Sequence, residues 1–544
     1  MTTMKREIFI FDAIAQSPDL PESEAVAVAE KKIRSLGVSL KDRKLEICKK
    51  SVDARKKDDI KLIYSVALSG EGFSDKERAK FERAGARCAV QEDLSFDFGE
   101  EKMAARPLVV GMGPAGMFCA LILAEQGYKP IIIDRGDRVA DRVAAMERFY
   151  TTHVLDTESN VQFGAGGAGT FSDGKLLTRI NDSKCSYVLD TFVRFGAPEE
   201  IRIKAKPHIG TDILRQVVDN ILAEIERLGG DVIYRCRLDD LSERTDGTVL
   251  AKTTKGDFVA SAVVLALGHS ARDTYKTLIT NQFDIIAKPI SVGVRIEHKR
   301  SFIEDALYGA MAGHPNLGAA EYSLSDTKGE RGVYTFCMCP GGEVMAAASE
   351  ADSVVVNGMS HYARDGANSN SAVAVSVQVS DIAPVEGNAA LGAIEFQRKI
   401  ERAAFAAGGG GYAVPVQMVG DFMSGKSGSE PREVMPTYMQ GQNFKTASMD
   451  DVLPDFVCRS LRYGLASFDR KIKGFASENA LLSGAETRTS SPLRILRGES
   501  MTALGKKSIY PCGEGAGYAG GITSAAVDGV KIAMAIISRF SPMD

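Results

Sequence analysis

The sequence predicts an α/β protein organised around a Rossmann-like dinucleotide-binding domain. The main evidence is one stretch in which the apolar run Leu108–Val110 leads into a turn that fits G-x-G-x-x-G, with its glycines at Gly111, Gly113 and Gly116. A helical pattern follows, and a second apolar run, Ile131–Ile133, ends at an aspartate. Strand, glycine turn, helix and acid-terminated strand in this order are typical of a nucleotide site. A β-meander pattern and a long β-rich region follow later in the chain.

The three glycines have separate predicted roles. Gly111 makes the tight turn, Gly113 lets the backbone approach a pyrophosphate, and Gly116 lets the helix pack closely against the strand. The N-terminus of the helix adds N–H groups and a positive dipole for the anion. Asp134 lies 23 residues after Gly111, close to the separation at which an acid holds the ribose hydroxyls.

Three other matches lack this context. Residues 164–169 and 515–520 fit the same hexapeptide, but neither is followed at the right distance by a strand that ends in an acid. Residues 420–427 fit the P-loop pattern G-x-x-x-x-G-K-S. A P-loop must open a helix, whereas Pro431 and Pro436 follow closely and proline breaks helix interiors. We therefore predict no triphosphate site there.

Length and composition limit the classes of function. A chain of 544 residues is too long for one core, and about three domains are expected. A net charge of −4 gives no global attraction to nucleic acid or to an anionic membrane. No apolar run approaches the roughly 20 residues that span a bilayer, and the start lacks the pattern of a signal peptide. Nine Cys without metal-type spacing and six unclustered His favour reduced thiols, a cytoplasmic location and no metal.

Residues 1–100 predict a separate, small α+β domain of the ferredoxin-like type. Alternating apolar residues and amphipathic patterns give the order βαββαβ. The six predicted elements are residues 6–11, 23–36, 44–48, 60–68, 74–83 and 87–91.

A basic segment lies between the two middle strands of this domain. Residues 49–57 contain Lys49, Lys50, Arg55, Lys56 and Lys57. We interpret the segment as a solvated hairpin, and the alternative is a contact with phosphate or nucleic acid.

The nucleotide-binding domain is predicted to be discontinuous. It spans residues 104–284 and 481–544, and a mixed antiparallel α+β substrate domain, residues 285–480, lies between its two parts. An amphipathic helix over 211–228 precedes three strands, 232–238, 248–254 and 258–267, that form the meander. The last helix opens at a Gly-Gly pair and runs to Phe540.

The assembled motifs resemble two-dinucleotide-binding flavoproteins of the glutathione-reductase type. More closely, they resemble a family of bacterial FAD-dependent dehydrogenases, and the resemblance covers nearly the whole chain. The runs that carry it are VQFGAGGAGTFSDGKL at 161–176, TFCMCPGGEV at 335–344, ETRTSSPLRI at 486–495 and YPCGEGAGYAGGITSAAVDG at 510–529.

The resemblance implies FAD as the cofactor and a position for each half of it. The implied ADP-binding residues are Gly111, Gly113, Pro114, Ala115, Gly116, Asp134 and Arg135. The implied lining of the isoalloxazine is Gly166, Gly167, Ala168, Gly169 and Thr170. A second Rossmann unit for NAD(P)H is missing from the sequence pattern, so the resemblance leaves a nicotinamide electron partner open and unsupported.

The resemblance also assigns the C-terminal motifs. Gly268 ends the strand that matches Ala-Thr-Gly, although Leu267 replaces the Thr. Gly513 and Glu514 stand where such flavoproteins carry Gly-Asp near the ribityl phosphate, and Glu keeps the carboxylate acceptor with a longer reach. The N–H groups expected near the N1–C2 carbonyl edge of the flavin are those of Gly520, Gly521 and Ile522.

Candidate catalytic residues lie outside the glycine motifs. On a regular strand, Cys337 and Cys339 place both sulfurs on one face, either beside the flavin or packed in the core. Arg488 and Arg494 are candidates for binding a substrate carboxylate or for bridging domains. His269 is a candidate proton donor or a residue beside the cofactor.

Two classes of function remain open from the sequence. The first is an FAD-dependent oxidoreductase that moves a hydride between flavin N5 and an unidentified small molecule. The second is a flavin-containing nucleic-acid-modifying or redox-sensing protein that docks RNA through its basic N-terminal domain.

Overall fold

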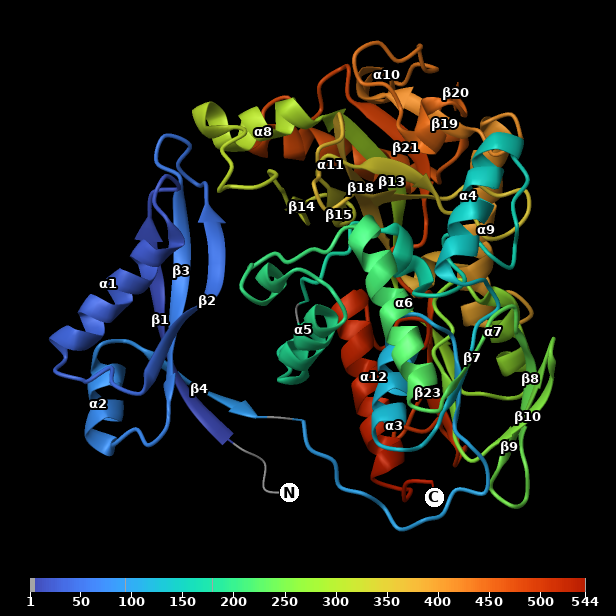
Figure 1. The fold of residues 1–544 in the computed structure, drawn as a ribbon. Helices are drawn as coiled ribbons and strands as arrows, with labels where there is room; N and C mark the ends of the chain where they lie inside the picture. Colours follow the sequence, from blue (N-terminus) through green and yellow to red (C-terminus); the bar gives the residue numbers. More distant parts are fainter. Residues whose placement is uncertain (1–4, 93, 179, 544) are drawn as a thin grey trace. The chain divides into compact units, whose positions relative to one another are not determined.

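The computed structural model describes residues 5–92, 94–178 and 180–543, and the chain forms two compact units (Figure 1). The first unit contains Met1–Ser95 together with Arg179–His208 and Ser301–Ala320. The second contains Phe96–Thr178, Ile209–Arg300 and Glu321–Asp544.

The first unit contains a four-stranded antiparallel sheet in the order β2-β3-β1-β4, with two helices. This confirms the predicted order βαββαβ. A cluster of phenylalanines fills its core, in which the Phe81 ring centroid lies 4.7 Å from that of Phe9 and 5.9 Å from that of Phe11. The elements are β1 (Lys5–Gln16), α1 (Glu22–Ser35), β2 (Arg43–Asp53), β3 (Lys61–Gly70), α2 (Asp75–Arg83) and β4 (Arg87–Glu92).

The second strand of this sheet is longer than predicted. β2 continues through Asp53, so the first half of the basic segment is strand and only the second half lies in the hairpin. Its ladder with β3 continues through Val52 and Asp53, which pair with Leu62 and Lys61. A second partner adds a bridge at Lys50: the Lys50 N–H donates to the Ile203 carbonyl at 2.6 Å, and the Ala205 N–H donates to the Lys50 carbonyl at 2.8 Å. The predicted domain bounds place that partner segment with the nucleotide domain. This segment follows α5 (Lys184–Arg194) and η2 (Glu199–Arg202) in the chain, and all of them belong to the first unit.

The second unit is built on a five-stranded parallel sheet in the order β23-β11-β5-β6-β7. The glycine turn joins β5 to α3 (Pro114–Glu125), and α3 packs against α12 (Ile522–Ile537) and α6 (Thr211–Arg227). The strands are β5 (Leu108–Val110), β6 (Ile131–Ile133), β7 (Asp231–Ile233), β11 (Val263–Leu265) and β23 (Ile509–Pro511).

The predicted meander is present, but its last strand is divided. Residues 258–267 form two elements, because the chain leaves the three-stranded meander sheet and enters the parallel sheet between them. The meander consists of β8 (Leu238–Glu243), β9 (Val249–Thr253) and β10 (Gly256–Ala260), and α7 (Arg272–Thr280) follows β11.

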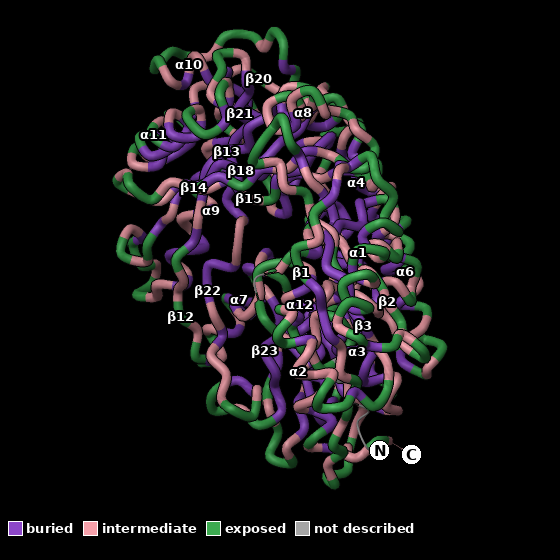
Figure 2. The backbone as a smooth tube through the Cα atoms, turned by 90° about the vertical axis from the view of Figure 1, so that its left-hand side faces the viewer, coloured by how far each residue is buried: buried purple, intermediate pink, exposed green. Residues whose placement is uncertain are grey.

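The cap of the second unit is a seven-stranded mixed sheet in the order β14-β15-β18-β13-β21-β19-β20. All of its pairings are antiparallel except that of β19 with β20. Its central strands are buried, as the purple segments of Figure 2 show. Its elements are β13 (Ile290–Lys299), β14 (Ser325–Asp326), β15 (Val333–Cys339), β18 (Asn368–Val377), β19 (Val414–Met418), β20 (Phe444–Thr446) and β21 (Leu481–Glu486).

Helices and two short ribbons complete the cap. The strand β21, which the predicted bounds place in the nucleotide domain, pairs with β13 and β19 of the cap sheet. The other elements are α9 (Ala389–Ala407), α10 (Val419–Ser424), α11 (Asp455–Lys471), the ribbon β16 (Glu343–Ala346) with β17 (Val356–Met359), and the ribbon β12 (Ile285–Ala287) with β22 (Leu493–Ile495). The helix that follows β13 in the chain, α8 (Arg300–Tyr308), belongs to the first unit from Ser301 onward.

The P-loop-like run does not open a helix. α10 precedes its Gly-Lys-Ser, and Gly425 ends that helix with φ +68°. The expectation that no helix follows is confirmed. Within the described part of the chain, no helix combines the length and the apolar character that a membrane crossing requires.

We predict that Phe81→Ala destabilises the N-terminal sheet locally. The ring is fully buried, and its loss leaves a cavity beside Phe9 and Phe11, which costs about 3–5 kcal/mol. Hydrogen exchange followed by mass spectrometry on peptides of β1 and β3 measures the loss of protection. Val28→Ala on α1 is the matched control, because Val28 is 46% exposed. Unchanged exchange in Phe81→Ala contradicts the prediction.

Candidate functional site

A cavity of about 460 Å³ lies in the second unit at the carboxyl ends of the parallel strands. Ends of four strands contribute to its wall: Gly111 after β5, Asp134 after β6, Ala266 after β11 and Cys512 after β23. In open α/β sheets this edge is where ligands bind. The cap sheet and its ribbon line the same cavity with Phe336, Cys337, Cys339, Asn357, Gly358 and Glu486.

The glycine turn has the geometry that a dinucleotide needs. Gly111 has φ +109°, and a Cβ there would lie 2.2 Å from the Ala266 carbonyl oxygen. A Cβ on Gly116 would lie 1.9 Å from the Gly111 carbonyl oxygen, so the helix and the strand touch through it. A Cβ on Gly113 would meet only the Gly167 Cα, at 4.0 Å. Gly113 therefore leaves open space for a ligand, whereas the other two glycines are required by packing.

Asp134 lines the cavity and also braces the turn. Its Oδ2 accepts the Met112 N–H at 2.8 Å, and its Oδ1 accepts the Gly136 N–H at 2.9 Å. Each oxygen keeps a further lone pair for a ribose hydroxyl.

Arg135 does not line the cavity, in contrast to its implied role. Its guanidinium donates to Glu158 and Asp273 at 2.8–3.0 Å and lies 4.3 Å from the centroid of the Phe163 ring. Two carboxylates hold it outside the wall, and it joins loops that surround the site.

Only part of the second glycine-rich segment, residues 164–170, lines the cavity. Gly167 and Gly169 line the cavity with Ala168, whereas Gly166 and Thr170 do not. The Thr170 hydroxyl donates to the Ala165 carbonyl at 2.8 Å, which turns it into the loop.

Arg142 supports this loop, and sequence analysis missed it. It is fully buried and donates to the carbonyl oxygens of Asn160, Val161, Ala165 and Gly167. Burial lowers the pKa of Arg142 to about 9. No motif signals it, because its partners are backbone atoms.

The C-terminal motif supplies Glu514 and the start of α12. Gly513 does not reach the wall: its N–H donates to Asp528 at 2.7 Å, and its φ of +76° makes the turn. Glu514 lines the cavity, and burial raises its pKa to about 7, which nearby Lys288 partly opposes. Residues that line the cavity at the start of α12 are Gly520, Gly521 and Ile522.

Gly520 and Gly521, like Gly113, have room for a Cβ atom. A Cβ on Gly520 or Gly521 would have no neighbour within 4 Å, so the chain leaves space for a ligand there, although the Gly520 N–H donates to the Ser524 hydroxyl at 3.1 Å. The same holds for Gly268 at the end of the Ala-x-Gly segment. The residues present therefore fit a dinucleotide at the Gly111 end and an aromatic ring system near α12.

Cys337 and Cys339 both line the cavity, but not through regular strand alternation. A bulge interrupts the pairing of β15 with β18 between Phe336 and Cys339, and Cys337 has φ +42°. The Cys339 thiol donates to the Cys337 carbonyl at 3.3 Å, and both cysteines are free. The surrounding protein raises the pKa of both thiols, that of Cys339 to about 12. Both are thus held protonated at neutral pH, which disfavours the predicted thiol reactivity.

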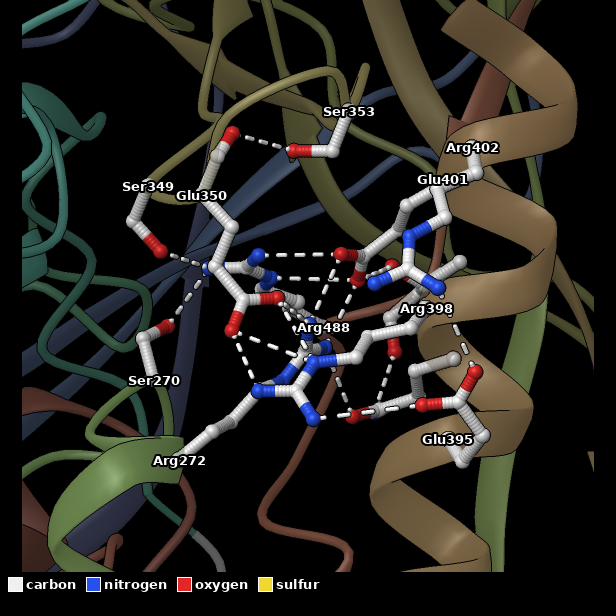
Figure 3. Close-up of polar contacts among 12 residues, drawn as sticks. Ser270, Arg272, Ser349, Glu350, Ser353, Glu395, Arg398, Glu401, Arg402 and Arg488 are labelled. Atoms are coloured by element: carbon white, nitrogen blue, oxygen red, sulfur yellow. Dashed lines mark hydrogen bonds and ion pairs between the residues drawn. The ribbon is translucent and has the colours of Figure 1, made fainter.

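Arg488 lines the cavity, but its donors are committed (Figure 3). Its Nε and Nη2 donate to Glu401 at 3.2 and 3.0 Å, and its Nη1 donates to Ser270 and Ser349. The geometry favours the bridging alternative over binding of a substrate carboxylate. Arg494 does not line the cavity, and its Nε donates to the Gly517 carbonyl at 3.1 Å.

Lys175 is a cavity residue that the chemical interpretation of the sequence missed, although it lies in the run at 161–176. Its Nζ donates to Asp173 at 2.8 Å and to the Met338 carbonyl. Burial disfavours the charged lysine, but Asp173 outweighs this and raises the pKa of Lys175. A charged ammonium therefore faces the cavity.

Comparison with known proteins supports a flavoprotein. Residues 289–489 match the family "FAD-dependent protein, C-terminal domain-like", and residues 14–69 match "Domain of unknown function (DUF8436)". An "Uncharacterized protein" of Clostridium beijerinckii is 47% identical over 522 residues, which cover 94% of this chain and 96% of that protein.

Other similarities are partial or weak. Protein FixC of Salmonella typhi is 28% identical over 206 residues, which cover 36% of this chain and 44% of FixC. Among solved structures, CtdE in complex with FAD has a TM-score of 0.31 at 12% identity, with 79% of this chain and 84% of CtdE covered. Glycine oxidase from Geobacillus kaustophilus has a TM-score of 0.33 at 11% identity, with 81% and 96% covered. These scores are too low to assign a function.

We predict that Gly113→Leu weakens flavin binding while the fold remains. Gly113 has φ −73°, which any residue adopts, and its side chain would occupy the space that the turn leaves open. FAD affinity is expected to fall by at least about tenfold, or about 1.4 kcal/mol. The ratio of flavin to protein absorbance measures it.

Gly428→Leu is the control for this change. It also has room for a Cβ, at 3.5 Å from the nearest side-chain atom, but it lies outside the cavity. Full flavin content in folded Gly113→Leu disproves the assignment of the turn.

We predict that Glu514 makes FAD-free protein less stable as the pH rises. Its folded pKa of about 7 lies above its ordinary value of 4.5, so the folded state binds more protons between these values. Its contribution is fully present below pH 4.5 and is lost as the pH rises to about 7, by up to about 3 kcal/mol. Urea unfolding at pH 5.0 and 7.5 measures it. Glu514→Gln is expected to show a smaller pH dependence than the unsubstituted protein, and equal dependence refutes the prediction.

Proposed function

From the membership of this chain in the family of the Clostridium beijerinckii protein, and from its FAD-dependent C-terminal domain, we propose an FAD-dependent oxidoreductase that moves a hydride between flavin N5 and a small molecule. FAD is the cofactor. The small molecule and the hydride step are the proposed part.

One observation carries this proposal. The same cavity is lined by the Gly111 turn and by side chains of the cap, among them Phe336 and Cys337. A cofactor held by the turn and a small molecule held by the cap thus share one space. Proximity of this kind is what a direct transfer between two bound molecules requires.

The chain supports such a transfer through its own charged groups. When bound, FAD supplies a two-electron acceptor or donor. Lys175 presents an ammonium that stabilises negative charge on a molecule in the cavity. Glu514, with a pKa near 7, holds or releases a proton in the neutral range.

The buried polar side chains of the cap form hydrogen bonds with one another. Arg295 donates to Glu486 at 2.7 Å and to the side chain of Asn370 at 2.7 Å, and all three are buried. Glu486 faces the cavity with its charge already paired. This pairing favours a small, weakly charged substrate over one with several charges.

RNA docking receives less support. Of the basic side chains in residues 49–57, Lys50 pairs with Glu22 at 2.8 Å and Arg55 pairs with Asp53 at 2.6 Å. These carboxylates reduce the positive potential of the segment, and docking of nucleic acid there stays a prediction.

Anaerobic stopped-flow tests the proposal. The flavin-loaded protein is mixed with NADH, NADPH and a panel of small alcohols, amines and unsaturated acids, and flavin absorbance reports reduction. Reduction by at least one compound is expected. Lys175→Met is expected to slow it by about 100-fold, the effect of removing one charge-stabilising donor.

Lys473→Met is the matched control, because the Lys473 side chain is 94% exposed and lies outside the cavity. Fully loaded protein that no compound reduces contradicts the proposed activity. Equal rates in Lys175→Met and Lys473→Met contradict the role of Lys175.

A further inference from the structure

A chain of hydrogen-bonded polar groups runs from α9 to the cavity wall. It begins at Glu401, which is fully buried, and continues through Arg488 and Ser270 (Figure 3). From Ser270 it branches to Gln162 and His269. Except for Glu401, all of these residues line the cavity.

Glu401 fixes the plane of Arg488. It accepts from Nε and Nη2 of Arg488, while Arg272 donates to the same carboxylate at 2.7 and 2.8 Å. This leaves Nη1 of Arg488 directed at the Ser270 hydroxyl, 3.0 Å away. A guanidinium has only donors, so Ser270 must accept this bond.

The orientation of the Gln162 amide determines which group accepts the hydroxyl proton of Ser270. The Nε2 of Gln162 donates to the Ala347 carbonyl at 3.2 Å, which fixes the orientation of the amide. Its Oε1 therefore faces the Ser270 hydroxyl, at 3.2 Å. An amide oxygen only accepts, so the single proton of Ser270 is donated to it.

The tautomer of His269 follows from this count. A serine hydroxyl has one proton and two lone pairs, and the proton and one lone pair are already used. The remaining lone pair faces the Nδ1 of His269 at 3.0 Å, so Nδ1 carries the proton and Nε2 is bare. The ring is neutral, because burial, Arg488 and Arg272 lower its pKa to about 3. Nε2 has no hydrogen-bond partner among the described residues.

We propose that Glu401, Arg488 and Ser270 are positioning residues that hold His269 with a bare Nε2 on the cavity wall, where it accepts a hydrogen bond from an O–H or N–H group of a bound molecule. This deepens the proposed function and rests on it for the identity of that molecule. The donor is a hydroxyl of the cofactor or the alcohol or amine group of a substrate.

Nitrogen-15 NMR of the full-length protein labelled at histidine tests the tautomer. His269→Asn identifies the His269 signals among those of the six histidines. In unsubstituted protein Nδ1 is expected to have the shift of a protonated nitrogen and Nε2 that of an unprotonated one. One hydrogen bond supports a preference of about tenfold. A protonated Nε2, or a charged ring, overturns the proposal.

Two serine variants separate positioning from general structure. Ser270→Ala removes the acceptor of the Nδ1 proton, and the tautomer ratio is expected to fall by about tenfold. Ser349→Ala is the matched control, because Ser349 accepts from the same Nη1 but does not contact His269 in the hydrogen-bond network. An unchanged ratio in folded Ser270→Ala overturns the positioning role.

The nitrogen-15 shift of His269 Nε2 in the same samples shows which molecule donates the hydrogen bond to it. A change of its shift on addition of FAD to the FAD-free protein identifies a cofactor hydroxyl. A change only on later addition of glycerol or 2-aminoethanol identifies an alcohol or amine. No change with any of these overturns the acceptor role. Flavin content and reduction rates are measured separately, so failure of the proposed activity is distinguished from failure of this inference.

Discussion

The buried ion cluster at Glu401 joins the nucleotide-binding sheet to the cap. Glu401 lies on α9 of the cap, Arg272 begins α7 after the parallel strand β11, and Arg488 follows the cap strand β21. All three side chains are almost completely removed from solvent. Burying three charges is costly unless each finds good partners, and the bidentate contacts with Glu401 provide them. Loss of Glu401 leaves Arg488 without a carboxylate partner in the buried cluster, so this carboxylate holds the two walls of the cavity in their relative position.

The positions of the cavity residues depend on that join. The Gly111 turn and Asp134 belong to the parallel sheet, while Cys337 and Asn357 come from the cap. Shifts of about 1 Å between such walls alter the alignment of bound reactants substantially. A second consequence is electrostatic: burial lowers the pKa of His269, and the two nearby arginines lower it further, so its ring stays neutral. Cap attachment and the chemistry of the wall therefore share the same side chains.

Several expectations from the sequence changed for identifiable reasons. Regular alternation placed Cys337 and Cys339 on one face, but a bulge breaks the strand between Phe336 and Cys339. Arg488 looked available for a substrate until Glu401, 87 residues away in the sequence, was found against it. The strand containing Lys50 extends because its ladder with β3 continues through Asp53, and a remote segment adds a bridge at Lys50. These contacts depend on partners outside each local segment.

What the sequence determined by itself is the nucleotide site. Gly111, Gly113, Gly116 and Asp134 lie within one strand–turn–helix–strand unit, whose geometry follows from glycine sterics and short-range hydrogen bonds. The order of the N-terminal elements is likewise read from local periodicity. Only the tertiary structure decided which glycines reach the cavity, that Lys175 faces it, and that His269 presents a bare nitrogen. These properties arise where segments far apart in the chain meet, and burial and pairing there are set by packing of the whole unit.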